Sequence, residues 1–181
     1  MRQFLKLFLL VLLLLPGCNA PPTPASTAAI SAPPTEQSSP LPPTSLPSTM
    51  GETHDVLVKF LTYLHEKNYA DAVPLYGGEY ESLQVFNTQI DPADKVALWA
   101  WACDNQLLQC LEVRSATFKT LSGDSYIFQV EFNNPDGSLF VRGPCCGANE
   151  TEMPPASQFE YTVSRDADSR YVVMNPPPYV P

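Results

Sequence analysis

A proline-rich segment at residues 19–50 limits what this chain can fold into. Its 32 residues include nine prolines, most of the others are Ser, Thr or Ala, and Glu36 is its only charged residue. Proline lacks a backbone N–H and breaks helices and central strands, and the segment has too little apolar bulk to form a core. We therefore predict a semi-extended spacer of polyproline character, followed by a single folded domain at residues 51–181.

A short apolar run precedes the spacer. Arg2 and Lys6 stand at its start, and residues 7–15 are all apolar. A charged front followed by a short apolar run is typical of an export signal, and the run is too short to span a bilayer comfortably. We therefore expect the chain to be exported from the cytoplasm.

The end of this run carries a second signal. Leu15, Gly17 and Cys18 match the lipobox that bacterial lipoproteins carry, while Pro16 is less usual at its position. The resemblance implies that residues 1–17 are removed as a signal peptide, that diacylglycerol is attached to the sulfur of Cys18, and that the new amino terminus is then acylated. The alternative is an ordinary secretory signal in which Cys18 is incidental.

The lipobox resemblance also implies where the domain lies. Two or more acyl chains hold a protein firmly at a membrane. Residues 18–50 would then be the acylated cysteine and its spacer. We expect the protein to be lipid-anchored in the cell envelope, with its domain outside the cytoplasm.

The charge of the chain excludes some partners. Its net charge is −9, and removal of the leader, which holds two basic residues and no acid, lowers this to −11. Nucleic acids and anionic lipid headgroups both attract a basic face. We therefore expect no nucleic-acid partner, and we expect membrane binding to depend on the acyl chains.

Apolar periodicity predicts helices in the first half of the domain. Apolar residues recur at helical spacing at Val56, Leu57, Phe60, Leu61 and Leu64. Thr53 is the expected N-cap of this helix. A shorter helix is expected over residues 69–76, and residues 80–86 fit either a strand or a helical turn. An Asp-Pro pair predicts a further helix over residues 91–103.

From residue 111 the apolar period changes to two. Strands are predicted over residues 111–121, 125–133, 138–142, 158–165 and 170–174. The clearest alternation places Tyr126, Phe128, Val130 and Phe132 on one face. Helices followed by an antiparallel meander predict an α+β domain, with the helices packed on one face of the sheet.

The first two predicted helices share one apolar pattern. It reads Val56-x-x-x-Phe60-Leu61-x-x-Leu64, then Asn68-Tyr69-x-x-Ala72-Val73-x-Leu75-Tyr76. With the order of the elements and the length of the domain, this pattern resembles the NTF2-like superfamily, and in particular the uncharacterised lipoproteins that carry one such domain. The resemblance implies a curved antiparallel sheet around a cystatin-like cone, which members use for binding, catalysis or dimerisation. It adds a homodimer through the sheet as a candidate assembly.

Four cysteines follow the spacer, at Cys103, Cys110, Cys145 and Cys146. An even number in an exported domain favours disulfides, and four cysteines permit three pairings. Cys103 ends a predicted helix and Cys110 opens the first strand, so both should lie at one end of the sheet. Two strand reversals later, Cys145 and Cys146 are expected towards the opposite end, beyond the roughly 7 Å that a bridge can span between Cα atoms.

We therefore favour a Cys103–Cys110 disulfide. Cys145 and Cys146 would then form a strained vicinal bridge, which could be redox-sensitive, or stay free thiols. The crossed pairings stay open if the third strand is short or strongly bent. Zinc fits poorly, because adjacent cysteines rarely both reach one tetrahedral ion, so we expect no metal.

The sequence offers little for catalysis. His54 and His65 lie three helical turns apart and cannot meet. A nucleophile-elbow serine and a glycine-rich phosphate loop are both missing from the sequence. We therefore predict no catalytic residue and no cofactor, and we favour binding over catalysis.

Aromatic residues are the remaining candidates for a site. Those expected to line a cavity are Tyr63, Trp99, Trp101, Phe128, Phe159 and Tyr161. Apolar walls with a few polar groups suit a small ligand, although a domain of this size also needs aromatic residues in its core. The expected function is binding of a small apolar or amphipathic ligand, or of a protein partner. The alternatives are an exposed apolar sheet face, or a small isomerase- or hydrolase-like enzyme with a carboxylate base in the cone.

Overall fold

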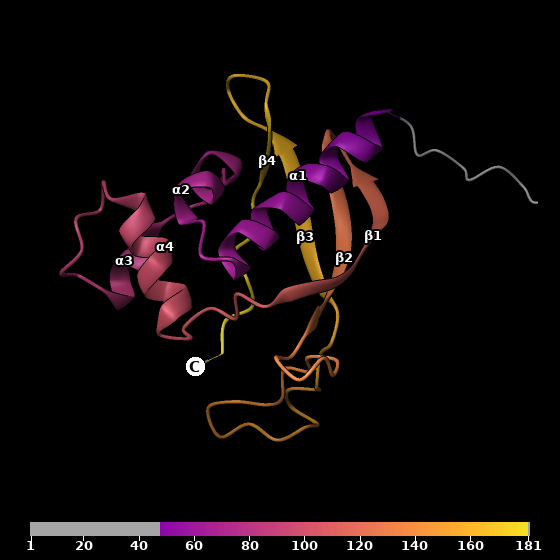
Figure 1. Cartoon of the computed structure of the whole chain (residues 1–181). Helices are drawn as coiled ribbons and strands as arrows, with labels where there is room; N and C mark the ends of the chain where they lie inside the picture. Colours follow the sequence, from indigo (N-terminus) through magenta and orange to yellow (C-terminus); the bar gives the residue numbers. More distant parts are fainter. Residues whose placement is uncertain (1–47, 181) are drawn as a thin grey trace, which may run out of the picture. The chain divides into compact units, whose positions relative to one another are not determined.

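The computed structural model describes residues 48–180 (Figure 1). The predicted signal peptide, Cys18 and the spacer up to residue 47 lie outside the described residues. Within residues 48–180, no helix combines the length and the apolar character needed to cross a membrane.

Helices come first along the described chain and strands follow. The helices are α1 (Ser48–His65), α2 (Tyr69–Ala72), the 3₁₀ helix η1 (Val73–Leu75), α3 (Glu81–Phe86) and α4 (Lys95–Asp104). The strands are β1 (Glu112–Ser122), β2 (Ser125–Asn133), β3 (Phe159–Arg165) and β4 (Tyr171–Val173). They form one open antiparallel sheet in the order β1-β2-β3-β4. The predicted α+β class is confirmed.

The core lies between α1 and one face of the sheet, which α1 crosses (Figure 1). Helix α1 buries Leu57, Phe60, Leu61 and Leu64. The sheet buries Phe128, Val130, Phe132, Tyr161, Val163 and Val173. The face of β2 that the period-two pattern predicted to be buried is therefore the buried one.

The outer face of the sheet is polar. Lys119 donates a hydrogen bond to Glu160, which is paired with Gln129 of the strand between them. Ser115 donates to Glu131 at 3.1 Å on the same face. This composition does not support the exposed apolar sheet face considered above.

Two helix starts differ from their predictions. Helix α1 begins at Ser48, so Thr53 lies inside it, fully buried, and its hydroxyl donates to the Met50 carbonyl at 3.0 Å. Helix α4 is capped by Asp94, whose Oδ1 accepts from the Ala97 amide at 2.9 Å. The Asp91 side chain instead forms a local turn, in which its Oδ1 accepts a hydrogen bond from the Ala93 amide. At α4 the error arose because Asp91 and Asp94 could each start the helix.

The predicted strand at residues 138–142 is wrong. This segment makes only isolated bridges, between Asn133 and Leu139 and between Arg142 and Ala156. The chain leaves the sheet after β2, and β3 takes the position beside β2. Because β1 begins, β2 ends and β3 begins at the same end of the sheet, the segment that carries Cys145 and Cys146 starts and finishes at that end. Its expected placement at the opposite end was therefore also wrong.

A close approach joins the helical half of the domain to β4. Tyr76 forms a parallel bridge with Val173, and the Gly77 amide donates to the Val173 carbonyl at 3.0 Å. A Cβ atom placed on Gly78 would lie 2.4 Å from the Met174 carbonyl oxygen. The contact therefore requires glycine at position 78.

Candidate functional site

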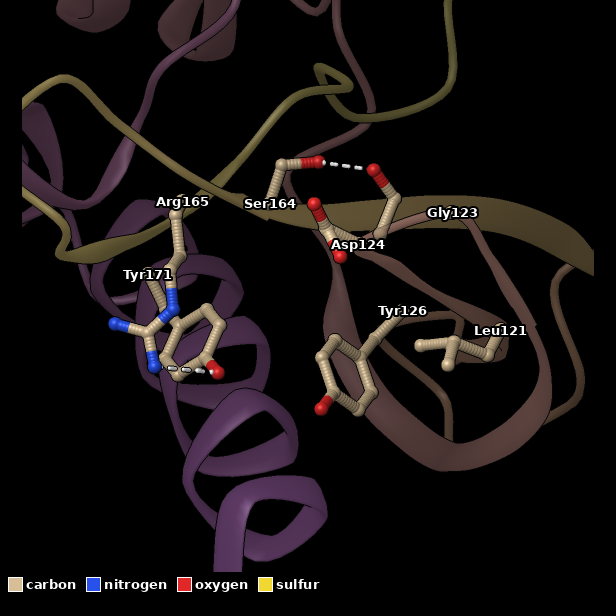
Figure 2. A pocket seen from close by; sticks show the side chains of 8 residues that line it. Leu121, Gly123, Asp124, Tyr126, Ser164, Arg165 and Tyr171 are labelled. Atoms are coloured by element: carbon tan, nitrogen blue, oxygen red, sulfur yellow. Dashed lines mark hydrogen bonds between the residues drawn. The ribbon is translucent and has the colours of Figure 1, made fainter.

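A pocket of about 590 Å³ opens at the end of the sheet where the β1–β2 and β3–β4 hairpins turn (Figure 2). Its lining residues are Leu121, Gly123, Asp124, Ser125, Tyr126, Ser164, Arg165 and Tyr171. Gly123, with φ of 58°, lies in the tight β1–β2 turn and so places residues 121–126 along one side of the pocket. The volume lies within the range of sites for small molecules, about 300–1,000 Å³.

Three side chains form the inner wall of the pocket. The rings of Tyr126 and Tyr171 meet edge to face, with centroids 5.9 Å apart. The Arg165 guanidinium lies 4.2 Å from the centroid of the Tyr171 ring and donates to its hydroxyl at 2.9 Å. β2, β3 and β4 each supply one of the three, and antiparallel register brings them to one place: Tyr126 pairs with Val163, and Arg165 pairs with Tyr171.

The rest of the pocket is polar. The hydroxyl groups of Ser125 and Ser164 lie 2.7 Å apart and share a hydrogen bond across the strands. Asp124 adds a carboxylate at the turn (Figure 2). Leu121, which pairs with Tyr126 in the β1–β2 register, is largely exposed. The pocket thus has an aromatic and cationic inner wall and a hydroxyl-bearing side.

The protonation of Tyr126 suits a hydrogen-bond donor. Burial raises the pKa of its hydroxyl above the ordinary value, and the neighbouring Tyr171 acts in the same direction. The phenol is therefore neutral at pH 7 and can donate. A ligand in this pocket would meet a guanidinium, a phenol donor and two ring surfaces.

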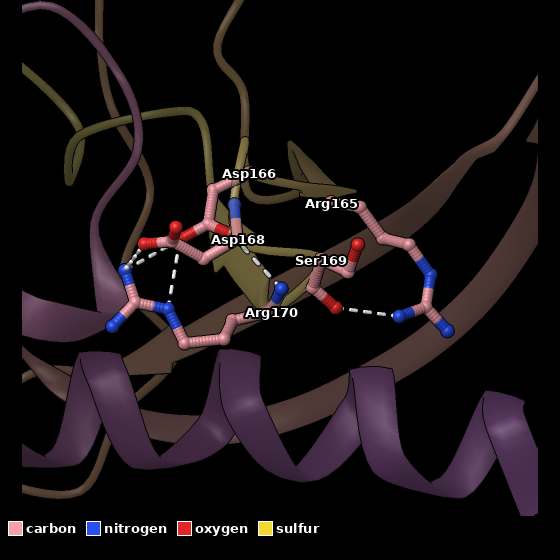
Figure 3. A network of polar contacts seen from close by, with 5 residues as sticks. All are labelled: Arg165, Asp166, Asp168, Ser169 and Arg170. Carbon is pink, nitrogen blue, oxygen red and sulfur yellow. Dashed lines mark hydrogen bonds and ion pairs between the residues drawn. The ribbon is translucent and has the colours of Figure 1, made fainter.

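The β3–β4 turn holds Arg165 in place (Figure 3). Asp166 accepts hydrogen bonds from the backbone amides of Asp168 and Arg170, each at 2.9 Å, and from the Arg170 guanidinium at 2.8 and 3.0 Å. Within this turn Ser169 has φ of 62°, and its carbonyl accepts from Arg165 at 2.5 Å. The network positions a guanidinium that would otherwise be free to swing into solvent.

The aromatic residues that were expected to line a cone are mostly core. Trp99 and Phe128 are 0 % exposed and Tyr161 is 1 % exposed. Tyr63 and Trp101 are half-buried and pack against the same core. The interior is filled by rings: the Trp99 ring contacts those of Phe60, Tyr76 and Tyr80, with centroids 5.0–5.9 Å apart.

Phe159 and Tyr161 also border a second, smaller space. This groove of about 320 Å³ lies between β3 and the C-terminal segment, and Arg142 and Asn175 are among its other lining residues. This groove is open to solvent and is smaller than the pocket of about 590 Å³ at the hairpin end. We therefore place the candidate ligand site at the hairpin end of the sheet.

The Cys103–Cys110 disulfide is present in the structure, as favoured from the sequence. Its Cα atoms are 5.5 Å apart, and it joins the last turn of α4 to the segment that leads into β1. Cys145 and Cys146 are free thiols. The favoured pairing is confirmed, although Cys145 and Cys146 had been expected at the wrong end of the sheet and the crossed pairings had been left open.

The histidines connect α1 to the sheet side of the fold. His54 Nε2 lies 3.2 Å from the Ala116 carbonyl oxygen, and His65 Nδ1 lies 3.2 Å from the Cys110 carbonyl oxygen. Each ring nitrogen can donate to its carbonyl and so hold α1 against β1 and against the segment that leads into it.

Among residues 48–180, each carboxyl group with a shifted pKa has it lowered, whereas a base in a closed cavity needs a raised pKa. A hydrogen bond from Lys67 lowers the pKa of Asp104, and one from Ser138 lowers that of Asp136. Backbone hydrogen bonding to Arg170 lowers the pKa of Asp166. These groups do not support the enzyme alternative.

Sequence reasoning missed Arg165 and Tyr171 as site residues. Tyr126 was assigned to the buried face of its strand, which is correct, but it stands at the end of that strand, where the core gives way to the pocket. The available signal was the pair of turn sequences at residues 122–125 and 166–169, which an antiparallel meander brings to the same end of the sheet.

Comparison of the chain with protein-family models, curated protein sequences and solved structures finds no match in any of the three.

Proposed function

We propose that this chain is a lipid-anchored protein of the cell envelope whose NTF2-like domain binds a small, flat ligand with an anionic group. The leader, the lipobox-like Leu15–Cys18 and the spacer that follows support the anchor. A disulfide in the folded part agrees with an oxidising compartment.

The NTF2-like assignment rests on the order of the elements. Helices precede an antiparallel meander, and α1 lies across one face of the sheet (Figure 1). The interior differs from an open cone, since an aromatic cluster fills the space under α1. In this chain the ligand site therefore lies at the hairpin end and not inside a cone.

The single observation that carries the binding function is the placement of Arg165 against Tyr171 in an open pocket of about 590 Å³. A guanidinium has five N–H donors, and two of its nitrogens here each donate one bond, to Tyr171 and Ser169. The other donors can bind a carboxylate or a phosphate, which arginine does well. The ring edges and faces of Tyr126 and Tyr171 suit a planar group attached to that anion.

Ligand binding is tested by titrating the full chain, purified in detergent, with small aromatic carboxylates. The probes are benzoate and 2-naphthoate, with 2-naphthol as the uncharged comparison. We expect saturable binding of the carboxylates, weakened at least tenfold by Arg165→Gln. The matched control is Arg114→Gln, which removes the same charge from an exposed arginine near the opposite end of β1.

Equal affinity of the Arg165 and Arg114 variants for naphthoate, or no saturable binding, would contradict the assigned site. The anchor is tested separately, by membrane fractionation of Cys18→Ser. We expect this variant to leave the membrane fraction, and unchanged partitioning would refute the lipid anchor without touching the ligand site.

A further inference from the structure

Two adjacent cysteines lie in the long connection between β2 and β3, away from the ligand pocket. Arg142 and Ala156 close this part of the connection, because each backbone amide donates to the other residue's carbonyl, at 2.8 and 2.9 Å. Cys145 is half-buried and Cys146 is exposed. The pair is thus held at the surface by a segment with a fixed base.

The backbone at this point forms a tight turn. The Ala148 amide donates to the Cys145 carbonyl at 2.9 Å, and the two central residues, Cys146 and Gly147, have φ of 60° and 87°. Positive φ suits glycine and is costly for a cysteine. Such strain in a non-glycine residue is often kept where a side chain must be presented in a particular direction.

The turn brings the two sulfur atoms together. Cys145 Sγ and Cys146 Sγ lie 2.8 Å apart. This is closer than two thiols pack when they merely share a surface, and a disulfide bond needs only a further shortening to about 2.05 Å. The two sulfur atoms therefore need to approach by less than about 1 Å to bond with each other.

A positive charge acts on the less exposed thiol. The contact with Cys146 raises the pKa of Cys145, and burial adds to this, while the Arg142 guanidinium acts in the opposite direction. Arg142 itself lies over the Phe159 ring, with its guanidinium carbon 5.7 Å from the ring centroid. The charge of Arg142 thus favours the Cys145 thiolate, while the contact with Cys146 and burial outweigh it and keep the pKa of Cys145 raised.

We propose that Cys145 and Cys146 are a redox-active dithiol that closes to a vicinal disulfide by exchange with an external disulfide. The exposed Cys146 thiolate attacks one sulfur of the oxidant R–S–S–R, which forms a mixed disulfide and releases one R–S⁻. Cys145 then gives its proton to water, attacks the Cys146 sulfur and releases the second R–S⁻. The protein loses two electrons and two protons, and the oxidant becomes two thiols.

The product should be easy to reduce. Consecutive Cα atoms across a trans peptide are about 3.8 Å apart, below the roughly 4.4–6.8 Å usual for disulfides. Cys103 and Cys110, at 5.5 Å, lie within that range. Because strained and exposed disulfides are the more easily reduced, the chain would hold one structural bridge and one reversible couple.

The test is a redox titration of the full chain, purified in detergent, with oxidised and reduced glutathione. After acid quenching, free thiols are alkylated and the protein is cut with trypsin. Cleavage at lysine and arginine puts Cys145 and Cys146 alone in the peptide 143–165, and Cys103 and Cys110 together in the peptide 96–114. Mass spectrometry then follows each pair independently, and Cys18 falls in a different peptide.

We expect oxidised glutathione to convert peptide 143–165 to a form that has lost two hydrogen atoms and takes no alkylating agent. Reduced glutathione should reopen it at a concentration at least tenfold lower than peptide 96–114 requires. A pair that stays fully alkylatable, that accumulates stable glutathione adducts, or that opens only together with Cys103–Cys110 would overturn the proposal.

Single variants test the order of attack. Cys145→Ser should keep one glutathione on Cys146, and Cys146→Ser should keep one on Cys145, formed several-fold more slowly because that thiol is less exposed. The reverse order of rates would overturn the assignment of Cys146 as the attacking group. Arg142→Gln should slow ring closure several-fold, and Arg142→Lys should restore it; failure of the lysine variant would leave Arg142 a structural residue without a part in the exchange.

Discussion

Arg165 binds Tyr171 twice, with its guanidinium 4.2 Å from the centroid of the ring and a 2.9 Å hydrogen bond to the hydroxyl. The two residues are partners in the β3–β4 register, so this contact spans the last rung of the sheet. Neither residue is free to move without the other, and together they set the shape of the pocket wall.

Tyr171→Phe should weaken the contact with Arg165 while the aromatic ring stays in the pocket wall. The ring stays and the hydroxyl acceptor is lost, so we expect a loss of about 0.5–1.5 kcal/mol in the free energy of unfolding. Affinity for naphthoate should fall several-fold, since Arg165 is less well positioned. Urea denaturation and titration measure the two effects. Tyr179→Phe, a half-exposed tyrosine outside the pocket, is the control and should change neither.

Trp99→Ala tests whether the interior is filled. The Trp99 ring lies 5.6 Å from the Phe60 ring, and its indole N–H donates to the Tyr80 hydroxyl at 3.1 Å. Removing a fully buried ring of this kind should cost about 3–5 kcal/mol of stability. Val85→Ala, at 67 % exposure, should stay within about 0.5 kcal/mol of the parent. A loss below about 1 kcal/mol for Trp99→Ala would instead indicate an open cone.

Gly78→Ala should destabilise the junction between the helices and β4. The added methyl group would lie 2.4 Å from the Met174 carbonyl oxygen, so backbone must shift, and we expect a cost of about 1–3 kcal/mol. Gly51→Ala is the matched control, because a Cβ there meets nothing within 4 Å and the residue is inside α1. That change should be neutral or stabilising by about 0.5–1 kcal/mol. Thermal unfolding of both variants checks the difference.

Asp166 should make stability depend on pH in the acid range. Its pKa in the folded protein lies below the ordinary value of 3.8, chiefly because the Arg170 amide hydrogen-bonds to it. The ionised form therefore stabilises the fold, an effect that is complete above about pH 5 and is lost as the pH falls through the lowered pKa.

Asp166→Asn should be less stable than the parent at pH 7, and the two should approach each other in stability below about pH 3. Urea denaturation at several pH values measures this. Asp168→Asn, whose carboxylate makes only the Arg170 contact, is the comparison and should show a smaller difference. Parallel curves for Asp166→Asn and the parent would contradict the role given to this carboxylate.

The parts of the fold that could be predicted are those in which the residue pattern fits only one secondary-structure element. The alternation from Tyr126 to Phe132 identified β2 and its buried face, and the helical spacing of the apolar residues from Leu57 to Leu64 identified α1. Local patterns fail where two neighbours compete, as Asp91 and Asp94 do for the start of α4. They also fail at residues 138–142, where pairing depends on which strand finally lies beside β2.

The ligand pocket was out of reach for a similar reason. Tyr126, Arg165 and Tyr171 are remote in sequence, and each is unremarkable in its own strand. Only the registers of β2, β3 and β4 bring them together. The disulfide was easier, since Cys103 and Cys110 are separated by seven positions in sequence and the intervening chain is short.

The backbone hydrogen bonds between Arg142 and Ala156 have one more consequence. They fix the two ends of the segment 143–155 relative to each other. A cut in that segment or a change in its length should therefore leave the pairing of β2 with β3 intact. Evolution could therefore lengthen, trim or replace that insert, sulfur atoms included, at little expense to the rest of the architecture.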